Sequence, residues 1–315
     1  AQLVDTATGR PVWAERFDRN LTDIFAVQDE VTLEIVTALK VSLSADEKAS
    51  IGSTGTTNLE AHENYMRLRG YLFYPGMGAS LWRRAISYGN HAIELDPEYA
   101  DAYGMLSIMH LMDFHNHWSG TSPTEALSKA QGLARRAVEL DPEGITSNHA
   151  VAVVARWMGD YDLAASAIEI TLAKSPEYAL GIFTRGEIFQ ATGRLREAVR
   201  DIEQAIRLDP GFTHQYLQFL GICQFLLGNY GTAVDLFQER IVHVKNTDIG
   251  RAWLASALGH QGKIAEAKKV WSDLLEINPE FCARTRIGRL AFSDPSQTDR
   301  VLEGLEKADL LAGSP

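Results

Sequence analysis

The sequence of 315 residues predicts an all-α fold: a superhelix of about six helix–turn–helix repeats with a C-terminal cap, preceded by a β-hairpin and one helix. The main observation is self-similarity. Four related segments begin at Gly159, Gly193, Gly228 and Gly262, at offsets of 34, 35 and 34 residues. Two shorter copies, AIELDPEYADAY and AVELDPEGITSN, lie upstream. A hydrophobic content of 45% with 23% charged residues is typical of a folded chain and argues against disorder.

The first 57 residues do not share this repeat. AQLVDT and PVWAERFD indicate two strands joined by a turn at Thr8 and Gly9. A helix should follow with Asp23 as its N-cap, because Ile24, Val27, Val31, Ile35 and Leu39 recur at helical spacing. We interpret 1–43 as the end of an α/β domain whose start lies upstream of Ala1, and the small, polar stretch at 44–57 as a linker.

Each repeat has the chemistry of two helices joined by a tight turn. The opening glycine permits a turn that would strain a side chain. An alanine five residues later allows close helix approach, at Ala164, Ala198, Ala233 and Ala267. A large apolar residue fills the space one turn further, at Ile168, Ile202, Phe237 and Trp271. A proline ends the second helix, at Pro142, Pro176, Pro210 and Pro279.

This pattern resembles the tetratricopeptide repeat. The resemblance divides 58–281 into copies at about 58–97, 98–144, 145–178, 179–212, 213–247 and 248–281. The second copy is longer by 11 residues, an excess that we assign to the histidine-rich stretch described next. Residues 282–315 lose the period and are predicted to form a cap and tail, because an open stack must cover its last apolar face.

The stretch HLMDFHNHWSG raises the question of a metal site. His110, Asp113 and His117 are spaced i, i+3 and i+7, so one helical stripe could bring them together on a metal. In the repeat register, however, His110 takes the place of a packed residue, and His115 and His117 fall in the extra residues that lengthen the turn. We favour one packed histidine followed by a polar loop, and keep a metal site as the alternative.

Composition excludes several classes of function. A net charge of −11 disfavours nucleic acid and anionic membranes, and no apolar run is long enough to span a bilayer. Only Cys223 and Cys282 are present, which fits a reducing, cytoplasmic location. The HExxH pattern that starts at His62 has Met66 in place of its second histidine, and no phosphate-binding or nucleophile motif occurs. We therefore expect a chain that is not itself an enzyme and that needs no cofactor.

The predicted function is binding of a protein or peptide in the concave groove, which the first helices of stacked repeats line. In tetratricopeptide proteins the second, fifth, ninth and twelfth repeat positions tend to face the ligand. These positions include His149, Val153, Arg156, Phe183, Glu187, Gln190, Gln218, Ile222 and Phe225. They predict a mixed apolar and polar groove with little positive charge, unlike the repeats that clamp chaperone carboxylates. Phe183 and Phe225 either bind a ligand or pack between helices, and both interpretations stay open.

A longer resemblance rests on motifs outside the repeats. AERFDR…DIFAVQDE looks like the end of a TolB-like domain, and AHENYMRLRGYLFYP, HWSGTSPTEAL and DRVLEGLEKADL look like the C-terminal half of the same proteins. Together they resemble bacterial class III adenylate/guanylate cyclase-type proteins. The resemblance implies a non-catalytic regulatory arm that brings a partner, or a second copy of itself, to a catalytic domain upstream. The alternative is the sensory arm of a winged-helix transcriptional regulator with the same C-terminal architecture.

Overall fold

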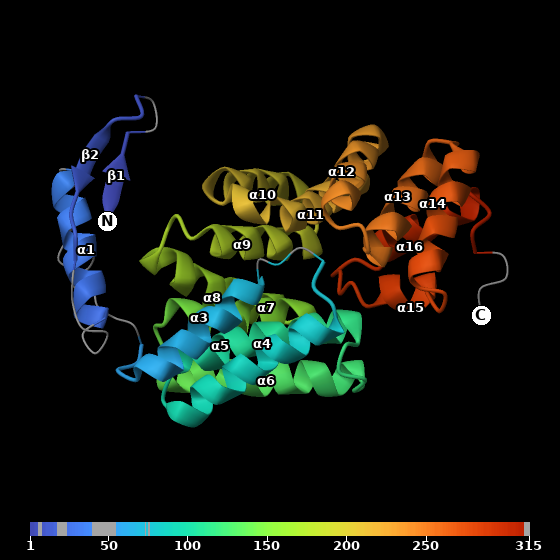
Figure 1. Ribbon diagram of the computed structural model, residues 1–315. Helices are drawn as coiled ribbons and strands as arrows, with labels where there is room; N and C mark the ends of the chain where they lie inside the picture. Colours follow the sequence, from blue (N-terminus) through green and yellow to red (C-terminus); the bar gives the residue numbers. More distant parts are fainter. Residues whose placement is uncertain (6–7, 18–23, 40–54, 73, 75, 312–315) are drawn as a thin grey trace.

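The computed structural model describes residues 1–5, 8–17, 24–39, 55–72, 74 and 76–311. The described part is all-α apart from one small hairpin, and its core is a superhelix of six helix pairs (Figure 1). The pairs are α3 (Leu59–Leu72) with α4 (Ala79–Leu95), α5 (Ala100–Asn116) with α6 (Pro123–Leu140), α7 (Ile145–Met158) with α8 (Tyr161–Lys174), α9 (Ala179–Ala191) with α10 (Leu195–Leu208), α11 (Thr213–Leu226) with α12 (Tyr230–His243), and α13 (Asp248–His260) with α14 (Ile264–Ile277). The predicted fold class is confirmed.

The repeat chemistry acts as expected. Gly159, Gly193, Gly228 and Gly262 have φ values of 81°, 78°, 86° and 73°, a left-handed region that glycine adopts without strain. The four repeat alanines are 0% exposed, and the four large apolar residues that follow are 0–7% exposed. The helices α6, α8, α10 and α14 each end two residues before the repeat proline. The short 3-10 helix η2 (Pro210–Phe212) follows one of these ends.

The second pair departs from the prediction. Helices α5 and α6 have 17 and 18 residues, against 14 and 14 in the next pair, so part of the 11 extra residues lengthens helices. His115 therefore belongs to α5, and not to the loop where the repeat register placed it. His117 follows as the C-cap, with φ 54°. A capping box between Ser122 and Glu125 then starts α6.

The hairpin pairs β1 (Gln2–Val4) with β2 (Pro11–Ala14) antiparallel, with Leu3 opposite Trp13. Helix α1 (Ile24–Ala38) follows, and both stand beside the array in Figure 1. The proposed Asp23 cap and most of the 44–57 linker lie outside the described residues. The domain boundaries themselves stay predictions.

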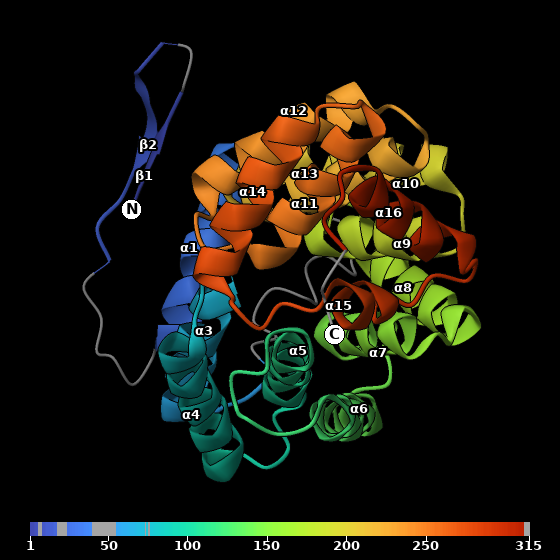
Figure 2. The ribbon, with the colours of Figure 1, turned by 90° about the vertical axis from the view of Figure 1, so that its right-hand side faces the viewer.

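The C-terminal residues form α15 (Ala283–Gly288) and α16 (Ser296–Lys307), which do not continue the repeat. Helix α16 packs closely on α13, where the Ser256 hydroxyl donates a 2.8 Å hydrogen bond to the carbonyl of Val301. A Cβ on Gly259 would lie 1.9 Å from the carbonyl oxygen of Gly304, so the two backbones touch. Figure 2 shows α15 between α7 and the last repeat.

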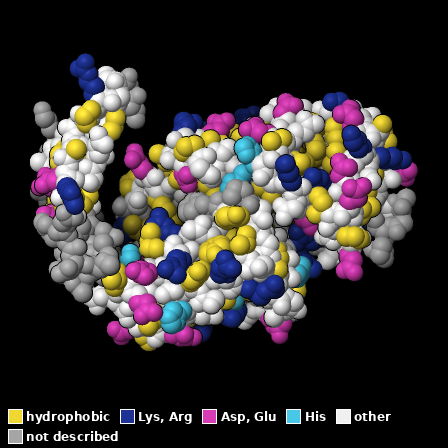
Figure 3. All heavy atoms as spheres, in the orientation of Figure 1, with side chains coloured by type: hydrophobic (Ala, Val, Ile, Leu, Met, Phe, Trp, Pro, Cys, Tyr) yellow, Lys and Arg dark blue, Asp and Glu magenta, His cyan; other side chains and the backbone are white. Residues whose placement is uncertain are grey.

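Acidic and basic side chains are intermingled over the face that Figure 3 shows. Within the described part of the chain, none of the helices combines the length and apolarity that crossing a bilayer requires.

Candidate ligand cavity in the concave groove

The concave face encloses a cavity of about 540 Å³. Its walls come from α5, α7, α9, α11 and α13 and from residues beyond α14. Eight of the nine residues selected from repeat positions line it: His149, Val153, Arg156, Phe183, Glu187, Gln190, Gln218 and Ile222. The structure thus brings these side chains together, although whether they bind a ligand stays a prediction.

Phe225 does not line the cavity. It is 0% exposed, and its ring lies 5.1 Å from that of Trp253, 5.2 Å from Tyr230 and 5.4 Å from His260, measured between centroids. Phe225 is a core residue, so the packing interpretation describes its environment. Phe183 lines the cavity and its ring also lies 4.9 Å from that of Tyr216, measured between centroids, so both interpretations stay open for this residue.

Two of the polar candidates, Gln190 and His149, contact polar groups of neighbouring helices. The amide nitrogen of Gln190 donates to the carbonyl of Phe219 at 2.9 Å, which joins α9 to α11. His149 Nε2 lies 2.9 Å from the Thr184 hydroxyl, and its Nδ1 lies 3.2 Å from the Tyr178 hydroxyl. Burial lowers the pKa of His149 to about 4, so the ring is neutral near pH 7. These residues hold the repeats in register.

Arg156 and Glu187 are the buried charged candidates. The Arg156 guanidinium carbon lies 3.9 Å from the centre of the Trp157 ring, and its Nε and Nη1 have no hydrogen-bond partner among the described residues. Burial raises the pKa of Glu187 to about 7, although the charge of Arg156 opposes this shift. A carboxyl with such a pKa exchanges its proton near neutral pH.

The cavity is more basic than the sequence predicted. Arg240, Arg286 and Arg289 also line it, against Asp248 and Glu187 as acidic residues. The expectation of little positive charge was wrong because the repeat rule considers first helices only. Arg240 lies on the second helix α12, and the other two arginines lie beyond the repeats. Only the close approach of these elements in the folded chain reveals the three arginines.

Residues 286–293, here called the C-terminal strap, run along the cavity and join distant repeats. Arg286 Nη1 donates to the carbonyl of His115, and its Nη2 lies 3.3 Å from Asp248 Oδ1. The backbone nitrogen of Ser293 donates to the carbonyl of Ala191 at 2.9 Å. The strap therefore ties the second, fourth and sixth pairs together across the groove.

The histidine-rich stretch has separate partners. His110 is 4% exposed and packs edge-on to Trp82, with ring centroids 5.8 Å apart. Asp113 Oδ1 accepts a 2.8 Å hydrogen bond from the backbone of Ser119, and His117 Nε2 contacts Arg289. His115 packs edge-on against Trp157, with ring centroids 4.1 Å apart, and lines the cavity. Across the described residues, no cluster of three His, Cys, Asp or Glu side chains could hold a metal ion.

Comparison with known proteins supports the repeat assignment. The tetratricopeptide repeat family matches residues 183–242. The crystal structure of the APC/C hetero-tetramer Cut9–Hcn1 superposes with a TM-score of 0.54 at 14% identity, over 90% of this chain and 54% of that one. PilW, a type IV pilus biogenesis factor, gives 0.50 at 15% identity, over 71% and 96%. Residues 183–242 thus match tetratricopeptide repeats in sequence, and the described helix pairs as a whole have the fold of a tetratricopeptide-repeat superhelix.

Two curated relatives match part of this tetratricopeptide-repeat chain. A protein described as putative adenylate cyclase 3 from Rhizobium meliloti (strain 1021) is 40% identical over 162 residues, 51% of this chain and 27% of its own length. Tetratricopeptide repeat protein 13 from Homo sapiens is 30% identical over 97 residues, 31% of this chain. The chain spans 27% and 11% of the lengths of these relatives.

Proposed function

We propose that this tetratricopeptide-repeat chain is the interaction arm of an adenylate cyclase-type signalling protein, and that its cavity binds a segment of a partner protein. The observation that carries the proposal is the cavity itself. Five successive first helices, from α5 to α13, and the strap supply most of its walls, and several buried polar atoms in it have no partner among the described residues. Such atoms cost free energy unless water or a ligand satisfies them.

The chemistry of the walls suits a polypeptide segment. Val153, Phe183 and Ile222 offer apolar surface, while Arg156, Glu187 and Gln218 offer charges and amides at intervals along the same wall. A small number of polar groups in an apolar cleft fixes the orientation of a bound chain.

The link to a cyclase is supported by the 40% identity to the putative adenylate cyclase, which covers about half of the present chain. In the proposed arrangement, another part of the parent protein is catalytic. This chain binds a partner, and that binding changes the activity of the catalytic part. A nucleotide cyclase uses intracellular nucleoside triphosphates, so the proposal puts the chain in the cytoplasm.

Val153→Trp tests the proposal, because Val153 lines the cavity and an indole in its place would occupy part of the cavity volume. The matched control is Val242→Trp, since Val242 is 72% exposed on α12 and lies outside the cavity. Both variants would be made in the full-length product of the gene. Partners cross-linked by wild type and by each variant would be identified by mass spectrometry, and cyclic AMP formation from ATP would be measured.

We expect Val153→Trp to lose a partner that Val242→Trp retains, and to alter the response of cyclic AMP formation to that partner. If both variants capture the same partners as wild type, the cavity is not the interaction site. If the full-length protein forms no cyclic nucleotide, the cyclase part of the proposal is wrong.

A further inference from the structure

Arg240 carries a buried positive charge without a carboxylate to balance it. Its side chain, on α12, is 7% exposed and lines the cavity. Nη1 donates to the carbonyl of His214 and lies 3.4 Å from Gln215 Oε1, while Nε has no hydrogen-bond partner among the described residues. Burial alone lowers the pKa of Arg240 to about 10, with no acidic neighbour opposing the shift. The guanidinium therefore stays protonated at neutral pH and lacks a counter-charge.

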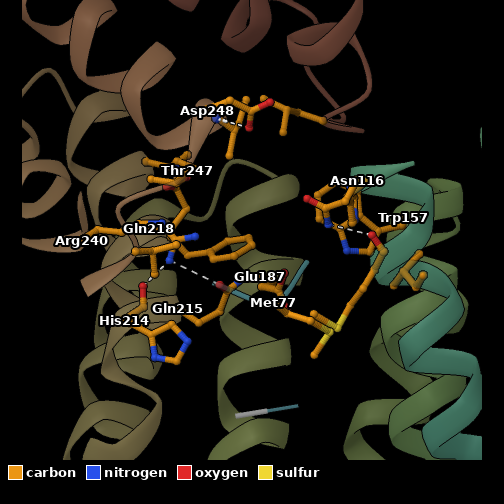
Figure 4. Close-up of a pocket in the computed structure, with 18 of the residues that line it drawn as sticks. Met77, Asn116, Trp157, Glu187, His214, Gln215, Gln218, Arg240, Thr247 and Asp248 are labelled. Carbon is orange, nitrogen blue, oxygen red and sulfur yellow. Dashed lines mark hydrogen bonds between the residues drawn. The ribbon is translucent and has the colours of Figure 1, made fainter. Parts of the chain in front are cut away.

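Gln218 lies beside Arg240 and is also unsatisfied. Figure 4 shows both side chains on one side of the cavity, with His214 and Gln215. Gln218 is 5% exposed, and neither its amide nitrogen nor its amide oxygen has a partner among the described residues. Its oxygen lies 3.2 Å from the position that a Cβ on Gly250 would take, which places the amide near the start of α13. A buried amide without partners is rare in folded proteins.

Thr247 completes this group of donors. The residue is 6% exposed, and its hydroxyl accepts a hydrogen bond from the backbone nitrogen of Gly250, which leaves the hydroxyl proton to donate. Thr247 lines the same cavity and lies above Gln218 in Figure 4. Arg240, Gln218 and Thr247 thus offer a guanidinium, an amide and a hydroxyl to one volume. Hydrogen bonds from such donors to an anionic oxygen are the stronger kind.

We propose that Arg240, Gln218 and Thr247 form a carboxylate-binding subsite within the cavity. A singly charged carboxylate fits better than a phosphate, because Arg240 is the one uncompensated guanidinium within this group of donors. Phe219, Ile222 and Trp253 line the cavity close by, so the carboxylate should be carried on an apolar body. This subsite specifies which chemical group of a partner the cavity would bind, and it rests on the proposed function of the groove. The subsite differs from a site built from the usual repeat positions on first helices, because its positive charge, Arg240, lies on the second helix α12.

Two pairs of probes test the subsite by isothermal titration calorimetry of the whole chain. The first pair is 3-phenylpropionate and its neutral amide. The second is a blocked pentapeptide with one glutamate between leucine and phenylalanine, and its glutamine counterpart. We expect each carboxylate to bind about tenfold or more tightly than its amide, since only the carboxylate neutralises the buried charge.

Gln218→Met is the main variant, because it keeps the length of the side chain and removes donors that have no partner within the described structure. It should fold normally and lose about tenfold in carboxylate affinity. Arg240→Met should lose at least as much, with circular dichroism checking the fold, since Arg240 also supports the His214 carbonyl. Arg196→Met, on the exposed side of α10, is the matched control and should bind as wild type does.

Equal affinity for acid and amide, or wild-type binding by Gln218→Met, would overturn the subsite. If the two peptides bind equally and Val153→Trp removes both, the groove function stands and the subsite falls. If 3-phenylpropionate binds and neither peptide does, the subsite stands, its ligand is a free organic acid, and the peptide function falls. Binding of the glutamate peptide alone would assign the carboxylate to a partner protein. If no probe binds at millimolar concentration, both proposals fall.

Discussion

The hydroxyl oxygen of Tyr161 lies 2.6 Å from the backbone carbonyl oxygen of Ala291, 130 residues further along the chain. This contact joins the start of α8 to the C-terminal strap, and together with the contacts of Arg286 it holds the strap along one side of the cavity.

Tyr161→Phe should loosen the strap, because it removes one hydrogen bond and keeps the ring. A hydrogen bond of this kind contributes about 0.5–1.5 kcal/mol, so local opening should rise about two- to tenfold. Limited trypsin digestion at Arg289 measures that opening. Tyr103→Phe is the control, since the Tyr103 hydroxyl makes no hydrogen bond in the described part of the structure. Equal cleavage rates in the two variants would show that Tyr161 does not hold the strap.

Glu187→Gln should change how stability depends on pH. The folded pKa of Glu187 is raised from 4.5 to about 7, so the folded state binds the proton more tightly than the unfolded state does. The free energy of unfolding should therefore fall as the pH rises between these two values, by at most about 3 kcal/mol at about 1.4 kcal/mol per unit.

The Glu187→Gln variant has no carboxyl at this position, so its free energy of unfolding should not show this decrease as the pH rises. Urea unfolding at pH 5 and pH 8 should show that its advantage over wild type is larger at pH 8. Buried histidines such as His149 shift stability in the opposite direction but are present in both proteins, so they cancel in the difference. An advantage of the same size at both pH values would mean that Glu187 titrates normally.

Gly259→Ala should destabilise the array despite the better helix propensity of alanine. The new Cβ would meet the Gly304 carbonyl at 1.9 Å, so α16 must shift away from α13. Forced overpacking costs about 1–3 kcal/mol. Gly132→Ala on α6 has open space around its Cβ and should instead stabilise by about 0.5–1 kcal/mol. Chemical denaturation measures the free energy of unfolding of both variants. Equal changes in the two variants would contradict the close contact of α13 with α16.

Phe225→Ala should lower the stability of the folded protein, because the ring is completely buried against Trp253. A Phe→Ala change in a packed core costs about 3–5 kcal/mol. Phe292→Ala, at a half-buried ring on the strap, should cost much less. Thermal unfolding measures both. A stable Phe225→Ala protein with impaired ligand binding would restore Phe225 to the binding surface.

The sequence alone determined the repeat architecture because its signals are local. A glycine at the turn, an alanine at the close approach and, after all but one of the second helices from α6 to α14, a proline act within one hairpin. Gly193, Ala198 and Pro210 therefore reveal their roles through spacing. The same periodicity placed His149, Val153 and Phe183 on the groove side, because a regular stack turns equivalent positions to the same face.

Only the tertiary structure decided the character of the cavity. Arg240 reaches it from a second helix, and Arg286 and Arg289 reach it from a segment without any period, so no repeat position predicts them. Phe225 has the repeat position of a groove residue, yet the rings of Trp253 and Tyr230 enclose it. Local pattern fixes which face a side chain occupies. Its burial, its partners and its charge environment depend on residues far away in sequence, which meet only when the superhelix has formed.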